Sequence, residues 1–239
     1  MPILDHAFVI LIAIVHPVVG YVSFTRLLRR AAAGLRIDRG RLYTGTVVSH
    51  WTLLALLLAI WLSAGRSLSG LGTALTLDAG FAVALALTAV GVVLLLRQLR
   101  AVQAADREAL VRFRSQLGPL EIILPAKESE LQRFTWLSLT AGIVEETLWR
   151  GYLFWYLLHY MPLWSAALVS TLAFGMAHAY QGIANVPKII AVGAVFAILY
   201  MLSGSIWLPI LMHALVDLIQ GRLAYEIVVR TGTPPPPGQ

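Results

Sequence analysis

The stretch from residue 141 to residue 151, AGIVEETLWRG, places three charged side chains inside an apolar segment of membrane-spanning length. Glu145, Glu146 and Arg150 would each cost at least about 2.5–3.5 kcal/mol in hydrocarbon by insertion scales. Bulk stability does not explain three such charges within six residues. Two later apolar segments carry similar groups, namely His178 in one and His213 with Asp217 in the other. Intramembrane acids and histidines that can converge predict a catalytic site.

The composition is typical of a membrane protein with several spans. Of the 239 residues, 59% are hydrophobic and 13% are charged, whereas ordinary soluble domains are about 45–50% apolar and about 25% charged. Cysteine is absent, which excludes disulfides, thiolate metal sites and a cysteine nucleophile. The net charge of +6 comes almost wholly from arginines between apolar segments. Arginines in that position indicate membrane topology and do not indicate a nucleic-acid partner.

The apolar segments predict an all-α transmembrane bundle of about seven spans, because a spanning helix needs about 20 mostly apolar residues. The expected spans cover residues 7–25, 44–64, 79–96, 131–158, 163–182, 187–203 and 206–227. Residues 97–116 are expected to form a short cytoplasmic amphipathic helix. The N-terminal helices and their basic loops occupy residues 1–130, and a proline-rich tail over residues 230–239 is expected to be disordered.

The basic residues predict the orientation of the bundle. They concentrate in residues 26–41 and 97–133, whereas the connection over residues 65–78 carries only Arg66. Because excess Lys and Arg mark the cytoplasmic side, we expect the N-terminus outside and the C-terminus in the cytoplasm. The expected location is the plasma membrane, as a multi-pass protein of a bacterial inner membrane.

The two adjacent glutamates are expected to have different roles. Helix positions i and i+4 share a face, so Glu146 and Arg150 can pair and neutralise each other. Glu145 lies about 100° further around the helix, where it has no partner on the same helix. A free carboxylate in this setting suits a general base.

The histidines divide into two groups. His178 lies one turn after Phe174, and His213 shares a helix face with Asp217, which is expected to orient its imidazole. A glutamate, two histidines and an orienting acid suffice to activate water and to stabilise an oxyanion, which predicts hydrolysis, foremost of a peptide bond. The remaining histidines have no partner at such spacing and are expected to be structural or interfacial: His6, His16, His50 and His159.

Three motifs in this order resemble the CAAX protease and bacteriocin-processing family, which includes the type II CAAX prenyl endopeptidases and the bacterial Abi proteins. The family pattern is Glu-Glu-x-x-x-Arg, then Phe-x-x-x-His, then His-x-x-x-Asn or Asp, each on its own transmembrane helix. The chain has EETLWR at residues 145–150, FGMAH at 174–178 and HALVD at 213–217. The resemblance covers about residues 130–225, and we expect residues 131–229 to form the protease core.

The resemblance implies an intramembrane endopeptidase that acts on membrane-embedded or lipidated proteins and peptides. CAAX-type processing and the removal of a C-terminal tag or leader are the implied reactions. It assigns water activation to Glu145 and His178 and oxyanion stabilisation to His213 and the residue four positions later. It assigns a supporting role to Glu146 and Arg150.

The chain departs from the better-known prenyl proteases at Asp217, where they have asparagine. An ionised aspartate cannot donate a hydrogen bond to an oxyanion, so Asp217 is either protonated, an orienter of His213 or a metal ligand. We expect no cofactor. The alternative is zinc held by Glu145, His178, His213 and Asp217, although the chain lacks the His-Glu-x-x-His spacing of zinc proteases.

Two other functions compete with proteolysis. A proton-coupled transporter also uses intramembrane acids and histidines, but transporters often contain internal repeats and this sequence shows none. A non-catalytic immunity or scaffold protein is the second alternative. It is disfavoured because the sequence retains every motif residue.

Overall fold

The protein is described by a computed structural model that covers residues 1–232. Helices make up all of the regular structure in this range, with no strand among the described residues, which confirms the all-α prediction. Residues 233–239 of the tail predicted to be disordered lie outside the described residues, whereas residues 230 and 231 belong to the last helix.

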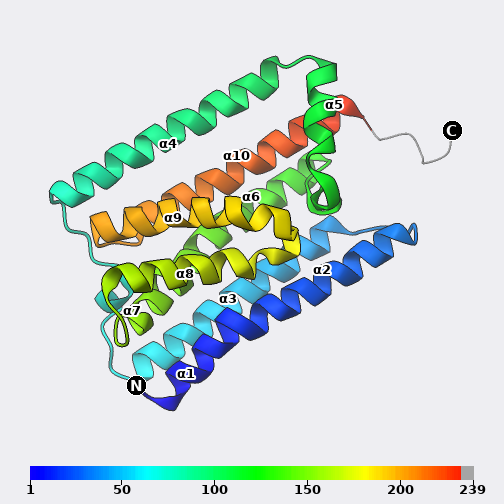
Figure 1. Cartoon of the computed structure of the whole chain (residues 1–239). Helices are drawn as coiled ribbons and strands as arrows, with labels where there is room; N and C mark the ends of the chain where they lie inside the picture. The colour runs from blue at the N-terminus through cyan, green and yellow to red at the C-terminus, as the bar shows by residue number, and fades with distance from the viewer. Residues whose placement is uncertain (233–239) are drawn as a thin grey trace.

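Most of the helices follow one another through short connections, and the longer ones are residues 64–78 and 116–127 (Figure 1). A π-helical segment, η1 (Leu11–Val15), joins the first two, and another, η4 (Thr147–Leu153), joins the sixth and seventh. The α-helices are α1 (Ile3–Ile10), α2 (His16–Ala32), α3 (Arg39–Ser63), α4 (Ala79–Ala104), α5 (Arg107–Ser115), α6 (Glu128–Glu146), α7 (Phe154–Leu157), α8 (Leu163–Ala177), α9 (Val186–Ser203) and α10 (Trp207–Thr231).

Four helical segments are long and apolar enough to cross a membrane. They are Ile3–Ala32, Arg39–Ser63, Ala79–Ala104 and Ile183–Ser203. The apolar helix α8 is shorter, and α6 and α10 carry the charged motif residues. The length and apolar character of these helices therefore identify a membrane protein. The count of seven spans stays a prediction.

Aspartates set the beginnings of three helices. The side chains of Asp38, Asp78 and Asp106 accept hydrogen bonds from backbone N–H groups at the starts of α3, α4 and α5, which is the usual N-cap arrangement. The Asp106 cap also divides the stretch 97–116, which we predicted as one amphipathic helix. Residues 97–104 continue α4, and α5 is a separate helix; its amphipathic character stays a prediction.

Helices α6 and α10 form the centre of the bundle. They contact each other, and α6 also contacts α3, while α10 contacts α4 and α9 (Figure 1). A close approach at Gly142 permits this packing, because a Cβ atom there would lie 2.9 Å from the Ala214 Cβ and 2.9 Å from the Ile210 carbonyl oxygen. Glu146, one turn after Gly142, is thereby brought beside α10, where it contacts His213.

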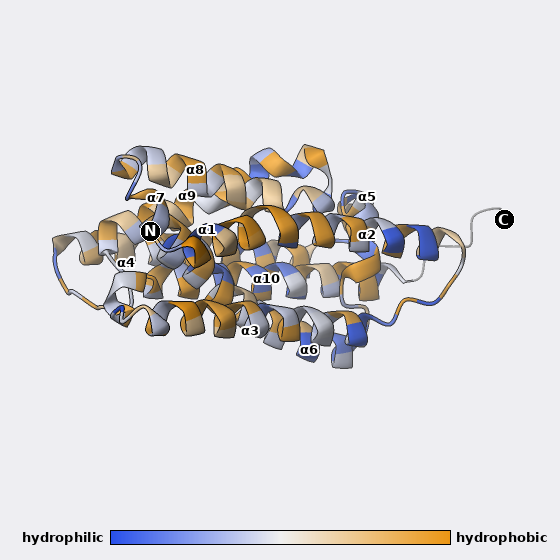
Figure 2. Ribbon diagram, turned by 90° about the horizontal axis from the view of Figure 1, so that it is seen from below, coloured by the Kyte–Doolittle hydropathy of each residue, from blue (hydrophilic) through white to orange (hydrophobic). Residues whose placement is uncertain are grey.

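The outer surface is apolar along the helices and basic at one end. Exposed side chains such as Val18, Leu56 and Val90 cover α2, α3 and α4. Hydrophilic segments gather at the end of the bundle where α2 finishes and α3 begins (Figure 2). This distribution fits a protein whose long helices face lipid and whose ends face water.

Candidate active site

The two glutamates lie where the backbone of α6 changes from an α-helix to the π-helical segment η4. Such π-helical turns often occur at functional sites. The expected pair across this junction is present: the Arg150 guanidinium donates to Glu146 Oε1 at 2.8 Å. Both side chains are almost fully buried.

Glu145 faces two histidines from other helices. Its Oε1 atom is 3.0 Å from Nε2 of His50 on α3, and its Oε2 atom is 3.6 Å from Nε2 of His178 at the end of α8. Within residues 1–232, no hydrogen-bond partner reaches Glu145 Oε2. One carboxylate oxygen is therefore anchored, and the other points towards His178.

Hydrogen bonds to backbone carbonyl oxygens require that Nδ1 of both imidazoles carries a hydrogen. His178 Nδ1 lies 2.8 Å from the Phe174 carbonyl oxygen, and His50 Nδ1 lies 2.9 Å from the Thr46 carbonyl oxygen. Because a carbonyl only accepts, both Nδ1 atoms donate. In a neutral His178, Nε2 consequently presents a lone pair towards Glu145. The 3.0 Å contact between His50 Nε2 and Glu145 Oε1 is a hydrogen bond, so one of these two atoms carries the hydrogen between them.

Glu146 joins a second network, which is buried. Its Oε1 atom accepts from Arg150 and also from Nδ1 of His213 on α10, the latter at 2.7 Å. Arg150 completes its contacts by donating to the Gly193 carbonyl oxygen at 2.9 Å. This arrangement needs glycine at position 193, since a Cβ there would lie 2.9 Å from the Phe174 ring and 3.2 Å from the Arg150 guanidinium.

Two phenylalanines hold the charged groups in place. The Arg150 guanidinium lies over the Phe174 ring at 4.4 Å and over the Phe196 ring at 5.4 Å, at distances where cation–π attraction is effective. Phe196 also stacks on His213 with a centroid distance of 4.9 Å, and Phe174 packs against His178 at 4.6 Å. The Phe-x-x-x-His motif thus contributes both the histidine and one wall of the site.

Asp217 does not hold His213 by a hydrogen bond. Its Oδ2 atom is 3.7 Å from His213 Nε2, which is beyond hydrogen-bond range. The orienting bond that we predicted from Asp217 comes instead from Glu146. The aspartate side chain is 35% exposed, whereas His213 is 6% exposed. Asp217 therefore lies at the accessible edge of the site, beside the imidazole nitrogen that Glu146 leaves free.

The structure brings all six predicted site residues into one cluster and adds two that we had assigned elsewhere. His50 contacts Glu145 directly, and the ring of His16 lies 6.0 Å from that of His50. The sequence feature that could have indicated these two residues is a histidine inside an apolar span, which is unusual. The other two histidines lie outside the cluster, His6 against Tyr156 and His159 against the Trp155 carbonyl oxygen.

The zinc alternative requires its ligands to surround a single ion. A tetrahedral zinc ion needs three or four ligands around one point. Among the described residues, no three His, Asp or Glu side chains are arranged to hold one ion. The recorded contacts are Glu145 with His178 and His213 with Asp217, and the absence of a cofactor stays a prediction.

A family comparison matches the part of the chain that supplies this cluster. Residues 127–219 match the model described as type II CAAX prenyl endopeptidase Rce1-like. This segment is similar to the type II CAAX prenyl endopeptidases of that model. The comparison with curated proteins and the comparison with solved structures gave no match.

The matched segment and the candidate site do not have the same limits. All six predicted residues lie within the match, and it confirms the resemblance read from the three motifs. His50 and His16 lie before its first residue, on α3 and α2. Helices that precede the matched segment therefore contribute side chains to the polar cluster.

Proposed function

We propose that the protein is an intramembrane endopeptidase that hydrolyses peptide bonds in membrane-embedded or lipidated proteins and peptides. One observation carries the proposal: Glu145 Oε2, unpartnered within residues 1–232, faces His178 Nε2 at 3.6 Å. The match of residues 127–219 to the type II CAAX prenyl endopeptidase Rce1-like model supports it.

Water activation would take place between Glu145 Oε2 and His178 Nε2, which are 3.6 Å apart. A water molecule that bridges them would donate one hydrogen to Glu145 Oε2 and the other to the lone pair of His178 Nε2. As its oxygen attacks the scissile carbonyl, one of the two side chains takes the proton as general base. The same proton can then pass to the leaving amine, whose departure breaks the peptide bond.

Oxyanion stabilisation would fall to His213. Glu146 accepts from Nδ1 and fixes the ring, so that Nε2 is the nitrogen directed at substrate. A protonated Nε2 donates to the oxyanion that forms on the carbonyl oxygen. Asp217, 3.7 Å from Nε2, is near enough to contact the same oxygen, and in its protonated form it donates as asparagine does.

Glu146 and Arg150 would act on the substrate only through other groups. Their ion pair is almost fully buried, and Glu146 positions His213. Arg150 balances the charge of this carboxylate and connects it to the Gly193 carbonyl oxygen. We assign both as positioning residues.

The test is a cleavage assay with protein purified in detergent. Wild-type protein and the Glu145→Ala variant are incubated with a library of peptides, including prenylated and unmodified sequences, and the products are identified by mass spectrometry. We expect cleavage by the wild type only. Equal cleavage by the variant would show that Glu145 is not needed. Absence of cleavage in both, together with proton-coupled uptake in vesicles, would favour the transporter alternative.

A further inference from the structure

His50 occupies a position that the three motifs do not include. It lies on α3, is 7% exposed, and its two ring nitrogens contact Thr46 on its own helix and Glu145 on α6. Other polar groups around it are His16, whose ring centroid is 6.0 Å away, and His178 on the far side of the same carboxylate. The imidazole is thus fixed at one end by its own backbone and presents the other end to Glu145.

We infer that His50 is a positioning residue for Glu145 in the proposed peptidase reaction. The terminal torsion of a glutamate is broad, so an isolated carboxylate rotates easily. The 3.0 Å contact with His50 anchors Oε1. That anchor directs Oε2 at His178, 3.6 Å away. The inference rests on the proposed function, because it assigns a role within that reaction.

The test compares three substitutions at position 50 in the full-length protein. In His50→Gln the side-chain amide still reaches Glu145 and donates to it. In His50→Asn the side chain is too short for its amide to reach Glu145, and in His50→Leu there is no amide. We expect kcat to fall by about 10²-fold in the leucine and asparagine variants, as for other misplaced catalytic groups. The glutamine variant should recover most of that loss. KM should change little in all three, because His50 positions the base and does not bind substrate.

A matched control separates this role from general destabilisation. His159→Leu removes an imidazole that bonds only to the Trp155 carbonyl oxygen, and it should leave kcat unchanged. Thermal unfolding of each variant confirms that it is folded. If wild type cleaves and Glu145→Ala does not, but folded His50→Asn has the wild-type kcat, the role of His50 is refuted while the proposed function stands. Failure of the wild type to cleave would instead refute the proposed function.

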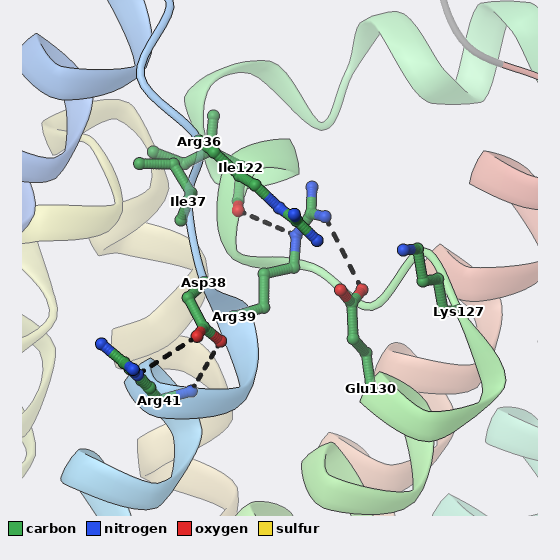
Figure 3. Close-up of a pocket in the computed structure, with 8 residues that line it drawn as sticks. All are labelled: Arg36, Ile37, Asp38, Arg39, Arg41, Ile122, Lys127 and Glu130. Atoms are coloured by element: carbon green, nitrogen blue, oxygen red, sulfur yellow. Dashed lines mark hydrogen bonds and ion pairs between the residues drawn. The ribbon is translucent and has the colours of Figure 1, made fainter.

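A second inference concerns a pocket of about 630 Å³ at the basic end of the bundle. It is lined by four cationic and two acidic side chains together with two isoleucines (Figure 3): Arg36, Ile37, Asp38, Arg39, Arg41, Ile122, Lys127 and Glu130. Each acid is already paired, Asp38 with Arg41 at 3.4 Å and Glu130 with Arg39 at 3.6 Å.

The other two cations of this pocket have no acid partner within residues 1–232, namely Arg36 and Lys127. The Arg36 guanidinium points into the pocket towards that of Arg39 (Figure 3). Like charges that converge repel each other unless an anion lies between them. Arg39 is also the first residue of a helix long enough to span a membrane, which places the pocket at the level of lipid headgroups.

We propose that this pocket binds the phosphate of an anionic lipid headgroup. Arginines suit phosphate oxygens, and basic pockets between spans are known sites for such lipids. Ile37 and Ile122 would contact the less polar part of the lipid. A free phosphate ion offers the same charged group without that apolar contact.

The test measures the rise in unfolding temperature when phosphatidylglycerol is added to purified protein in neutral detergent. Parallel samples receive phosphatidylcholine or sodium phosphate at the same concentration. The pocket variant is Arg36→Gln with Lys127→Gln. The matched control, Arg97→Gln with Arg100→Gln, removes the same charge from the exposed surface of α4. We expect phosphatidylglycerol to stabilise wild type and control, and the pocket variant to lose at least half of the rise. Equal stabilisation of the pocket variant, or an equal rise with sodium phosphate alone, would overturn the proposal.

Discussion

Glu145 and Glu146 are neighbours in the chain, yet their carboxylates belong to different networks. Glu145 lies between His50 and His178, with Oε1 bonded to His50 and Oε2 facing His178 at 3.6 Å. The Oε2 atoms of both glutamates lack a hydrogen-bond partner within residues 1–232. Glu146 is shared by Arg150 and His213 and is fully buried. Adjacent helix positions point about 100° apart, and this rotation places the two carboxylates in separate networks. In the proposed reaction, Glu145 acts on water and Glu146 positions its neighbours.

The shared carboxylate of Glu146 should be essential for stability. Glu146→Ala leaves Arg150 and His213 buried without their acid, and loss of one partner of a buried pair costs about 3–5 kcal/mol. The control is Glu108→Ala, which breaks an exposed i,i+4 pair with Arg112 that we expect to contribute less than about 1 kcal/mol. Chemical unfolding in detergent measures both. Equal losses in the two variants would contradict the central place of Glu146.

Substitutions of Asp217 separate the possible roles of this residue. If it donates to the oxyanion in its protonated form, Asp217→Asn keeps the shape and a donor, so most activity should remain, while Asp217→Ala should lose it. If it is a metal ligand, asparagine removes the negative charge and activity should fall together with bound metal. Kinetics and metal analysis of the same preparations distinguish the two. Stoichiometric zinc in active wild type, lost along with activity in Asp217→Asn, would make the protein a metalloprotease.

Sequence spacing predicted contacts within one helix and missed contacts between helices. The Glu146–Arg150 pair follows from an i,i+4 spacing, and the structure contains it. The contact of Glu145 with His50 joins residues 95 positions apart, and that of Glu146 with His213 joins residues 67 positions apart. Such contacts depend on which helices pack together, and single-helix spacing carries no information on that packing. For this reason His50 was predicted to be structural or interfacial.

At the scale of the helices, the site depends on how closely α6 approaches α10. Gly142 lies one turn before Glu146 and contacts the backbone of α10 around Ile210 and Ala214. This contact sets the distance at which Glu146 meets His213. The sequence located both helices, because their motifs lie in long apolar segments, but the glycine contact became visible only in the packed bundle.

Enlarging Gly142 should therefore disturb both stability and activity. In Gly142→Ala the new Cβ would lie 2.9 Å from the Ile210 carbonyl oxygen and 2.9 Å from the Ala214 Cβ, so the helices must move apart. We expect a loss of about 1–3 kcal/mol, as for other overpacked cores, and a lower kcat. Thermal unfolding and the cleavage assay measure the two effects.

Gly45→Ala on α3 is the matched control for this substitution. A Cβ at Gly45 meets nothing within 4 Å among the described residues. Because alanine is the better helix former, the control should gain up to about 1 kcal/mol. If Gly142→Ala were as stable and active as the control, the close approach of α6 and α10 would have no role in the site.

For the whole molecule, the distribution of basic residues predicts the orientation in the membrane. Six arginines lie between residues 26 and 41, and a second basic stretch follows α4. In the structure, α2 ends and α3 begins at the same end of the bundle (Figure 2). The orientation itself stays a prediction, which depends on charge in the loops and not on helix packing.

Cysteine labelling tests this topology with no background, because the natural chain has no cysteine. We place single cysteines at Leu35, Ser69 and Ser115, which are exposed. In intact cells, a membrane-impermeant maleimide should label only the cysteine at position 69. The other two should react after the membrane is opened. Labelling of position 35 from outside would reverse the predicted orientation.

The central claim is that Glu145 and His178 act as one unit on a bound water molecule. The most direct measurement is a double-mutant cycle on kcat/KM for a cleaved peptide, with Glu145→Gln, His178→Gln and the double variant, each confirmed to be folded. Each single substitution should lower the rate by about 10²–10⁴-fold. Because groups that act together are non-additive, the double variant should be no slower than the slower single variant. A double variant slowed by the product of the two single effects would contradict the account.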